Sequence, residues 1–320
     1  MKTSIFSDSQ PTELPLGIID VGSNSIKILL VQAEPQGMEV LLEAVEETRI
    51  SAGIAGDPPR LCEASIQAGI DSIAALMNQG RQAGVKSWIA VATSAVRDAT
   101  NQQHFLDILH RETGLALRVL SGLEEAHYIA RGATCDPKVA NLRDFRLVDL
   151  GGGSLEIISF LNEEIKQAIS LPLGAVRLTE KFITQIENPL NLAELESISR
   201  HISQYLESNE VDLASPKLPL VASGGGFQVA RQVWVNSPDS YRMSETQIPL
   251  TWLKQWRFTL ASMSLAERLR IPGVPAGRAD IMPAAVQIMV TLAEIASQDR
   301  FHITPFNLRY GIAREVIESL

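Results

Sequence analysis

The stretch from Asp149 to Ser154 reads Asp-Leu-Gly-Gly-Gly-Ser and lies between two apolar runs, residues 145–148 and 155–160. Such runs predict β-strands, so the stretch is expected to be the turn of a β-hairpin. Glycine has no Cβ atom, and backbone N–H groups in a glycine-rich turn can therefore approach an anion closely. The flanking carboxylates of Asp149 and Glu156 supply the hard oxygen ligands that Mg²⁺ prefers. The sequence therefore predicts a phosphate-binding turn beside a metal site.

The same arrangement occurs a second time, nearer the N-terminus. Apolar runs at residues 16–19 and 26–31 flank a turn with the sequence Asp20-Val21-Gly22-Ser23-Asn24-Ser25. Because two Asp-led hairpins of one design lie far apart in the chain, the sequence has the pattern of a duplicated half-molecule. It therefore predicts two similar domains that hold one ligand between them.

A third glycine-rich turn, Ser223-Gly224-Gly225-Gly226, follows an apolar run at residues 218–222 and precedes an expected helix. Glycine-rich turns also occur in ordinary hairpins, which need residues with positive φ, and the third turn has a purely structural reading as a strand-to-helix turn. Its functional reading is a helix N-terminus that faces an anion. Three such turns in one chain, two of them led by Asp, favour phosphate binding.

Length and composition limit the classes of protein to which this chain can belong. Its 320 residues allow about two domains, and 45% hydrophobic with 20% charged residues is normal for a soluble globular protein. The formal net charge of −9 argues against a nucleic-acid partner, so a polyanionic ligand would require Mg²⁺ and a few local arginines. The two cysteines, Cys62 and Cys135, form no motif and indicate a reducing compartment.

Neither the N-terminus nor the most apolar segment predicts membrane targeting. Residues 1–15 are polar, contain Pro11 and Pro15 and lack an apolar core, so they are expected to be a disordered tail and not a signal peptide. Residues 279–296 form the longest apolar helix pattern, but Asp280 and Glu294 lie within it, which predicts a core helix. The expected location is the cytoplasm, with no membrane partner.

The remaining patterns predict alternating strands and helices in both halves, joined by a linker at residues 134–144. In the first half we expect strands at 16–20, 26–33, 38–44, 88–93 and 116–120, helices at 62–80, 101–113 and 121–133, and a polar loop at 94–98. In the second half we expect a hairpin at 145–160, strands at 166–171, 218–222 and 301–304, and helices at 174–186, 191–208, 249–261, 264–269 and 278–297, with others from 227 and 307. This order predicts an α/β fold with mixed sheets.

The stretch Ser121-Gly122-Leu123-Glu124-Glu125-Ala126 carries two adjacent carboxylates with different expected roles. Ser121 and Glu124, three residues apart, form the pattern of a capping box at a helix N-terminus. Glu125 has no such explanation. It can serve as a general base, or it can be a carboxylate that the helix dipole favours in the first turn. The local sequence alone favours the second interpretation.

Arg97 directly follows an expected strand. Its planar guanidinium can bind phosphate through two N–H groups, although a single loop arginine is more often only solvated. Arg49, Arg177 and Arg278 are weaker candidates of the same kind. The five histidines show no metal-ligand spacing, and the sequence contains neither a P-loop nor a Gly-x-Ser-x-Gly motif.

Four blocks, taken in order, resemble the exopolyphosphatase/guanosine pentaphosphate phosphohydrolase (Ppx/GppA) family of the actin–hexokinase–sugar-kinase superfamily. They are residues 20–25, 93–97, 121–126 and 149–154 with Glu156. Residues 170–174, 278–280 and 308–311 support the match, which spans residues 16 to 316. The resemblance implies an α/β fold of two ribonuclease-H-like (actin-like ATPase) domains whose mixed sheets flank a central cleft. The expected boundaries are 16–136 and 137–306, with a C-terminal helix at 307–320 that packs on the first domain.

The resemblance also implies an activity, which is the release of terminal phosphate from inorganic polyphosphate, guanosine pentaphosphate or both, with Mg²⁺ or another divalent cation as cofactor. It gives Glu125 the role of catalytic base, and it implies a metal site of Asp149 and Glu156, to which we add Asp20. The expected phosphate-binding residues are Gly22, Ser23, Asn24, Arg97, Gly151, Gly152, Gly153, Ser154, Gly224 and Gly225. The chain departs from the family at Gly226, where Thr is usual, so a phosphate-facing hydroxyl is expected to be missing. Longer relatives carry an extra C-terminal helical domain, and this chain is expected to lack one.

Two other functions remain as alternatives. A kinase or ATPase of the same superfamily would share the two phosphate-binding hairpins, but the Glu124-Glu125 pair after a Ser-Gly turn fits a phosphatase better. A catalytically silent polyphosphate-binding regulatory protein is the alternative from another class, and the intact carboxylate set argues against it. The expected partners are the substrate and, in a homodimer, a second copy of the chain.

Overall fold

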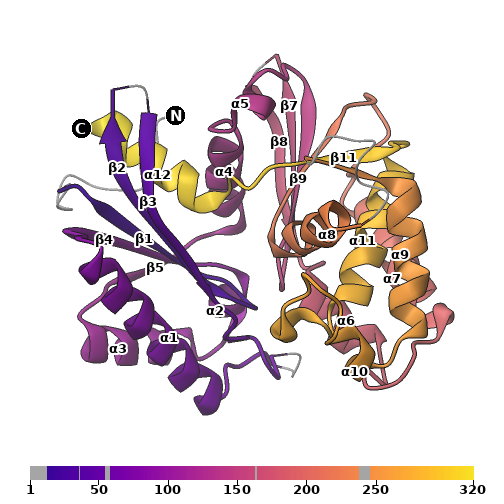
Figure 1. The fold of residues 1–320 in the computed structure, drawn as a ribbon, viewed down its shortest axis with the longest axis horizontal. Helices are drawn as coiled ribbons and strands as arrows, with labels where there is room; N and C mark the ends of the chain where they lie inside the picture. The colour runs from indigo at the N-terminus through magenta and orange to yellow at the C-terminus, as the bar shows by residue number, and fades with distance from the viewer. Residues whose placement is uncertain (1–12, 36, 55–57, 163, 238–245) are drawn as a thin grey trace. The chain divides into compact units, whose positions relative to one another are not determined.

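The computed structural model describes residues 13–35, 37–54, 58–162, 164–237 and 246–320. The chain divides into two compact units, Met1–Pro137 with Phe306–Leu320, and Lys138–Pro305 (Figure 1). That these units are separate folding domains stays a prediction. Most of the expected tail at 1–15 lies outside the described residues. At its end, the carbonyl oxygen of Pro15 accepts a hydrogen bond of 2.9 Å from the N–H of Lys86.

The first unit contains a five-stranded mixed sheet in the order β3-β2-β1-β4-β5. Its strands are β1 (Leu16–Val21), β2 (Ile26–Glu34), β3 (Gly37–Glu46), β4 (Ser87–Ala92) and β5 (Leu117–Val119). The first three strands pair antiparallel, whereas β4 pairs parallel with both β1 and β5. In β1, Ile19 and Val21 enter the core below the sheet, so Asp20 between them projects from the opposite face.

Helices cover both faces of this sheet (Figure 1). The helices of the first unit are α1 (Glu63–Gln82), α2 (Ser94–Asp98), α3 (Gln102–Thr113), α4 (Gly122–Ala133) and α12 (Leu308–Ser319). The apolar stripes of α1 and α3, which include Ile73 and Phe105, pack on the Ile19 side of the sheet. Helices α4 and α12 lie side by side on the opposite face of the sheet. The C-terminal helix therefore belongs to the first unit.

Two glycines allow α4 and its neighbour α12 to approach closely. A Cβ atom at Gly132 would lie 1.9 Å from the carbonyl oxygen of Asn307, and one at Gly311 would lie 2.0 Å from that of Tyr128. Any larger residue would push the helices apart. The hydroxyl of Tyr128 donates to Glu315 Oε1 at 3.0 Å, and burial raises the pKa of this phenol far above its usual value. The chain end thereby holds the helix that carries Glu125.

The sheet of the second unit has the order β8-β7-β6-β9-β11-β10. Its strands are β6 (Phe145–Leu150), β7 (Leu155–Leu161), β8 (Glu164–Leu171), β9 (Leu220–Ser223), β10 (Gln247–Pro249) and β11 (Arg300–Ile303). An antiparallel meander of three strands is again followed by two parallel strands, which is the order of the first sheet. The additional edge strand β10 pairs antiparallel with β11.

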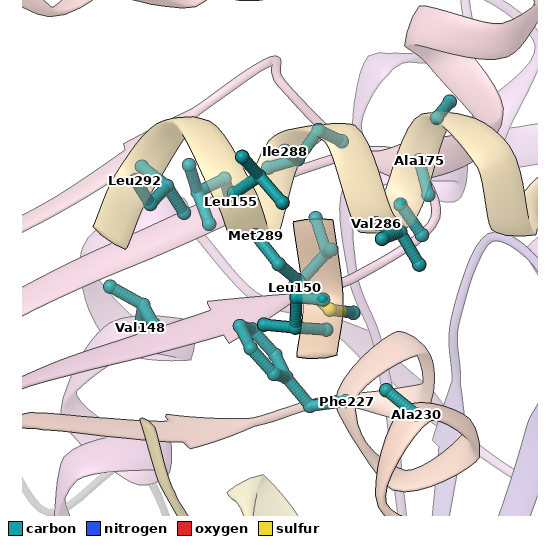
Figure 2. Packing of buried hydrophobic residues seen from close by; sticks show 14 of the residues in the cluster. Val148, Leu150, Leu155, Ala175, Phe227, Ala230, Val286, Ile288, Met289 and Leu292 are labelled. Carbon is teal, nitrogen blue, oxygen red and sulfur yellow. The ribbon is translucent and has the colours of Figure 1, made fainter. Parts of the chain in front are cut away.

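The core of the second unit lies between one face of this sheet and a layer of helices. These are α6 (Ala175–Phe182), α7 (Leu192–Ser208), α8 (Gly225–Val235), α9 (Leu250–Ser262), α10 (Leu265–Arg268), a 3-10 turn (Ala276–Arg278) and α11 (Met282–Ile295). Figure 2 shows Leu150 of β6 near Phe227 of α8 and Met289 of α11. Helix α11 is buried from Met282 to Ala293, which explains why its sequence is apolar on all sides.

The expected α/β fold with two mixed sheets is confirmed, and three local expectations are corrected. Residues 94–98, expected to be a polar loop, form the short helix α2, and the expected linker contains the helix α5 (Pro137–Ala140). The strand β10 was not expected, because three residues are too few to show periodicity. Among the described residues, no helix combines the length and apolar character needed to cross a membrane.

Candidate active site

The turns of the two Asp-led hairpins close in the same way. The N–H of Gly22 donates to the carbonyl oxygen of Ser25 at 3.1 Å, and the N–H of Gly151 donates to that of Ser154 at 3.0 Å. A Cβ atom at Gly22 or Gly151 would lie only 3.1 or 3.2 Å from the same oxygen. The repeated Asp-x-Gly pattern therefore corresponds to one repeated backbone structure.

The carbonyl side of the second hairpin turn is held by the N-terminus of α6. The N–H groups of Ala175 and Val176 donate to Gly151 and Gly152 at 3.0 and 2.8 Å, and Arg177 Nε donates to Gly153 at 3.0 Å. In the described part of the chain, the N–H groups of Gly152 and Gly153 have no acceptor. A turn whose carbonyls are satisfied and whose N–H groups are open is suited to an anion. Arg177 therefore supports this turn through Nε, and its weak candidacy as a phosphate ligand stays a prediction.

The turn of the first hairpin is held by the segment that follows β3. The N–H and hydroxyl groups of Ser51 donate to the carbonyl oxygen of Ser23 at 3.1 and 3.0 Å, and the N–H of Arg49 donates to that of Asn24 at 2.9 Å. Arg49 Nε lies 3.3 Å from Asn24 Oδ1, and its φ of 47° places it in the left-handed region. Ser23 Oγ and Ser94 Oγ are 2.9 Å apart. Arg49 therefore supports the turn that is predicted to bind phosphate, and its own contact with phosphate stays a prediction.

The third turn leads from β9 into α8 and needs glycine for two reasons. Gly224 has a φ of 96°, and a Cβ atom there would lie 2.4 Å from the carbonyl oxygen of Leu150. A Cβ atom at Gly225 would lie 2.1 Å from Nη1 of Arg278, so this buried guanidinium packs on the turn. Arg278 is thereby next to one of the predicted phosphate-binding residues.

The expectation for Gly226 was wrong. A Cβ atom at this position would approach Met289, Leu150 and Ala285 at 3.3 to 3.5 Å. A side chain at 226 therefore points into the core of the second unit, and glycine here does not remove a phosphate-facing hydroxyl. The sequence could not show this direction, because it depends on how α8 packs against α11.

Asp149 and Glu156 are directly opposite each other in the β6–β7 pair, so both carboxylates project from the same face of the sheet. Each side chain is buried and accepts a hydrogen bond from a serine of the next strand. Ser223 Oγ donates to Asp149 Oδ2, and Ser170 Oγ donates to Glu156 Oε1 at 2.7 Å. Neither serine was predicted as a site residue. Their contribution depends on strand register, which the sequence does not display.

This pair fits a divalent cation that is shared with a phosphate ligand. Mg²⁺ is usually bound by one or two carboxylates, with waters and substrate phosphate oxygens completing its coordination. In the described part of the chain, no three Asp, Glu, His or Cys side chains gather as a metal site of their own. Asp20 belongs to the first unit, where its Oδ2 lies 3.6 Å from Lys27 Nζ. The predicted metal role of all three carboxylates stays a prediction.

The first turn of α4 holds the two adjacent glutamates in different environments. Glu124 closes the predicted capping box, because its Oε2 accepts from the N–H of Ser121 at 2.8 Å and Ser121 Oγ accepts from the N–H of Glu124 at 3.2 Å. Burial raises the pKa of Glu124, but the hydrogen bonds from Ser121 and the ion pair with Arg118 outweigh it and hold this pKa below its usual value. The capping role of Glu124 is confirmed.

Glu125 is buried and pairs with Arg97. Arg97 Nη1 lies 2.7 Å from Glu125 Oε2 and also donates to the carbonyl oxygen of Leu120 at 3.1 Å. Arg97 Nη2 has no hydrogen-bond partner among the described residues. The two predicted residues are therefore brought together by α2 and α4. One edge of the guanidinium holds the carboxylate, and another remains open for a ligand.

Comparison with known proteins identifies the family. Residues 29–319 match the model of the Ppx/GppA phosphatase family. The chain belongs to this family. Exopolyphosphatase 1 of Mycobacterium tuberculosis is 26% identical over 312 residues, which cover 95% of this chain and 88% of that protein. The guanosine-5'-triphosphate,3'-diphosphate pyrophosphatase of Vibrio parahaemolyticus is 27% identical over 315 residues, which cover 98% of this chain but only 61% of the relative.

Solved structures agree with this assignment. The Ppx/GppA enzyme of Aquifex aeolicus has a TM-score of 0.74 and 26% identity, covering 93% of this chain and 97% of that one. An exopolyphosphatase from Cytophaga hutchinsonii has a TM-score of 0.84 over 95% of this chain and 98% of that one, and at 21% identity it supports the fold alone. As a member of the Ppx/GppA phosphatase family, the chain is a phosphohydrolase that cleaves phosphoanhydride bonds. No comparison favours the kinase or the silent regulatory protein.

Proposed function

We propose that this Ppx/GppA phosphatase releases the terminal phosphate of inorganic polyphosphate, of guanosine pentaphosphate, or of both, with Mg²⁺ or another divalent cation. The observation that carries this proposal is the buried Asp149–Glu156 pair at the edge of a glycine turn whose N–H groups at Gly152 and Gly153 are open. Carboxylates and amide donors side by side suit a ligand that brings both an anion and its cation.

The proposed roles follow from these contacts. The open N–H groups of Gly152 and Gly153 bind phosphate oxygens, and the open edge of Arg97 binds another. Asp149 and Glu156 would hold a divalent cation, which would offset the charge of the phosphates. Glu125 accepts a proton from water as the water oxygen attacks the terminal phosphorus.

In the proposed hydrolysis, one bond to the terminal phosphorus forms and one breaks. A P–O bond forms to the water oxygen while the bond from the same phosphorus to the bridging oxygen breaks. The products are orthophosphate and a chain that is one phosphate shorter. Arg97 stays in contact with Glu125, so one guanidinium orients both the base and the phosphate.

The proposal places the protein in the cytoplasm, in keeping with the two cysteines, Cys62 and Cys135, which are both free. Homodimer formation is a further part of the proposal, and the mass in solution would measure it.

The decisive experiment measures phosphate release from polyphosphate, guanosine pentaphosphate and ATP side by side, with Mg²⁺ and with excess chelator. We expect release from at least one of the first two substrates, slower release from ATP, and loss of activity in chelator. Activity on ATP alone would support the superfamily ATPase alternative. Full turnover in chelator would contradict the proposed metal dependence.

A further inference from the structure

One row of four polar side chains crosses the sheet of the second unit. Ser223 of β9 is paired in register with Asp149 of β6, Asp149 with Glu156 of β7, and Glu156 with Ser170 of β8. Residues paired in this way on neighbouring strands project from the same face. The order across the sheet is therefore hydroxyl, carboxylate, carboxylate, hydroxyl.

The next row on the same face is apolar. It consists of Val221, Leu147, Ile158 and Ala168, which are also paired in register. Polar side chains therefore begin where β6 and β9 approach their glycine turns. In this buried setting a carboxylate needs hydrogen-bond donors, and a donor fixes the direction of the oxygen that it holds. Each serine meets this need for the carboxylate beside it.

The first unit provides an internal comparison. The residues that pair with Asp20 and Lys27 from the outer strands are Val91 and Val45, which carry no hydroxyl group. Where the second carboxylate is replaced by a lysine, the two flanking donors are also absent. Both units contain the hairpin, but the serines are present only in the unit that has two paired carboxylates.

We infer that Ser170 and Ser223 are positioning residues for the divalent cation. Each hydroxyl holds one carboxylate oxygen and so sets the direction in which Glu156 or Asp149 presents its charge to the cation. This inference rests on the proposed cation-dependent function. Groups that orient metal ligands in this way contribute strongly to metal affinity without touching the metal.

The test measures cation binding by the full chain without any substrate. Mn²⁺ serves as the probe, and the signal of free Mn²⁺ in electron paramagnetic resonance gives the dissociation constant. We expect Ser170→Ala and Ser223→Ala each to weaken Mn²⁺ binding by about 10- to 100-fold. Ser170→Thr and Ser223→Thr keep the hydroxyl and should restore binding to within a few-fold of the natural chain.

Ser159→Ala is the matched control. Ser159 is also a buried serine of β7, but its hydroxyl accepts from Arg146 Nε at 3.2 Å and touches neither carboxylate. The Ser159→Ala variant should therefore bind Mn²⁺ with the same affinity as the natural chain. If an alanine variant does not fold, the corresponding cysteine variant takes its place, because a thiol has a similar size and is a much weaker donor.

Unchanged Mn²⁺ affinity in the folded Ser170 and Ser223 variants would overturn the inference. An equal loss in Ser159→Ala, or no Mn²⁺ binding by the natural chain, would overturn it as well. Phosphate release by the same preparations separates this result from the proposed function. Serine-dependent Mn²⁺ binding without any phosphate release would support the positioning role and contradict the proposed function. Phosphate release together with Mn²⁺ binding that does not depend on the serines would support the proposed function and contradict the positioning role.

Discussion

Asp20 in the first unit and Asp149 in the second occupy the same place in two hairpins of one design, yet they face different partners. Across the strand pair, Asp20 lies opposite Lys27, whereas Asp149 lies opposite Glu156. The first pair is a salt bridge that neutralises itself, with 3.6 Å between Nζ and Oδ2. The second brings together two buried carboxyl groups, each of which accepts a hydrogen bond from a serine.

Two hairpins with the same turn can therefore present different charges. The backbone of the turn is retained, because Gly22 and Gly151 make the same hydrogen bond to a serine three residues on. A single exchange at the cross-strand position changes the charge of the site. A self-neutralised hairpin can contact an anion directly, whereas a doubly acidic one requires a cation first. We therefore propose that the second hairpin, rather than the first, binds the cation.

Making the second hairpin resemble the first should have the largest effect. Glu156→Lys would place an ammonium opposite Asp149 and remove the proposed cation site. We expect phosphate release to fall by about 10³-fold or more, because metal charge stabilisation is worth several kcal/mol. Steady-state phosphate release with Mg²⁺ measures this, and circular dichroism checks the fold. Activity close to that of the natural chain would refute the assignment of the cation to the second hairpin.

The second prediction removes the proposed general base of the first unit and leaves the proposed cation site of the second unit intact. Glu125→Gln should lower turnover by about 10²–10⁴-fold while Mn²⁺ affinity stays unchanged. The matched variant is Glu124→Gln, which alters the neighbouring capping carboxylate and should leave turnover nearly intact. Turnover and Mn²⁺ titration are measured on both. If the two variants exchange phenotypes, the assignment within the pair is wrong.

The third prediction concerns the salt bridge that distinguishes the first hairpin. Lys27→Met leaves the mostly buried Asp20 carboxylate without its cation, which should lower the free energy of unfolding by about 1–3 kcal/mol. Lys166→Met breaks the pair with Glu164 on a solvent-exposed strand and should leave the free energy of unfolding nearly unchanged. Urea unfolding measures both. Equal changes would show that the Asp20–Lys27 pair is as weak as a surface pair.

The smallest expected effect is a pH dependence at Glu124. The folded-state pKa of this carboxyl lies below its usual value of 4.5, so its stabilising contribution is present above that pH. It is lost as the pH falls through the lowered pKa. The natural chain should therefore exceed Glu124→Gln in unfolding free energy by up to about 1 kcal/mol at pH 7. The difference in unfolding free energy between the two proteins should disappear at an acidic pH below the lowered pKa. Urea unfolding at pH 7 and at that acidic pH would measure it. A constant gap would mean that the ionised carboxylate is not what stabilises the cap.

Much of the architecture could be predicted because it depends on residues that are close together in the sequence. The hairpins around Gly22 and Gly151, the amphipathic helix α1 and the capping box at Ser121 each depend on neighbouring residues, and each was predicted within a few residues. Helix α2 was missed because five residues show no helical period. Gly226 was misread because the direction of its Cβ atom depends on helix packing.

The fold class, the family resemblance and the types of residue at the site could be recognised in the sequence, because glycine turns and paired carboxylates depend on residues that are close together in the chain. Which of these residues are in contact depends on tertiary packing and could not be read from local patterns. Register places Ser223 and Ser170, far apart in the chain, beside Asp149 and Glu156. The ion pair between Arg97 of α2 and Glu125 of α4 likewise joins residues that are distant in the chain. Such contacts arise when distant segments bury their apolar faces together, and no local pattern records the register that results.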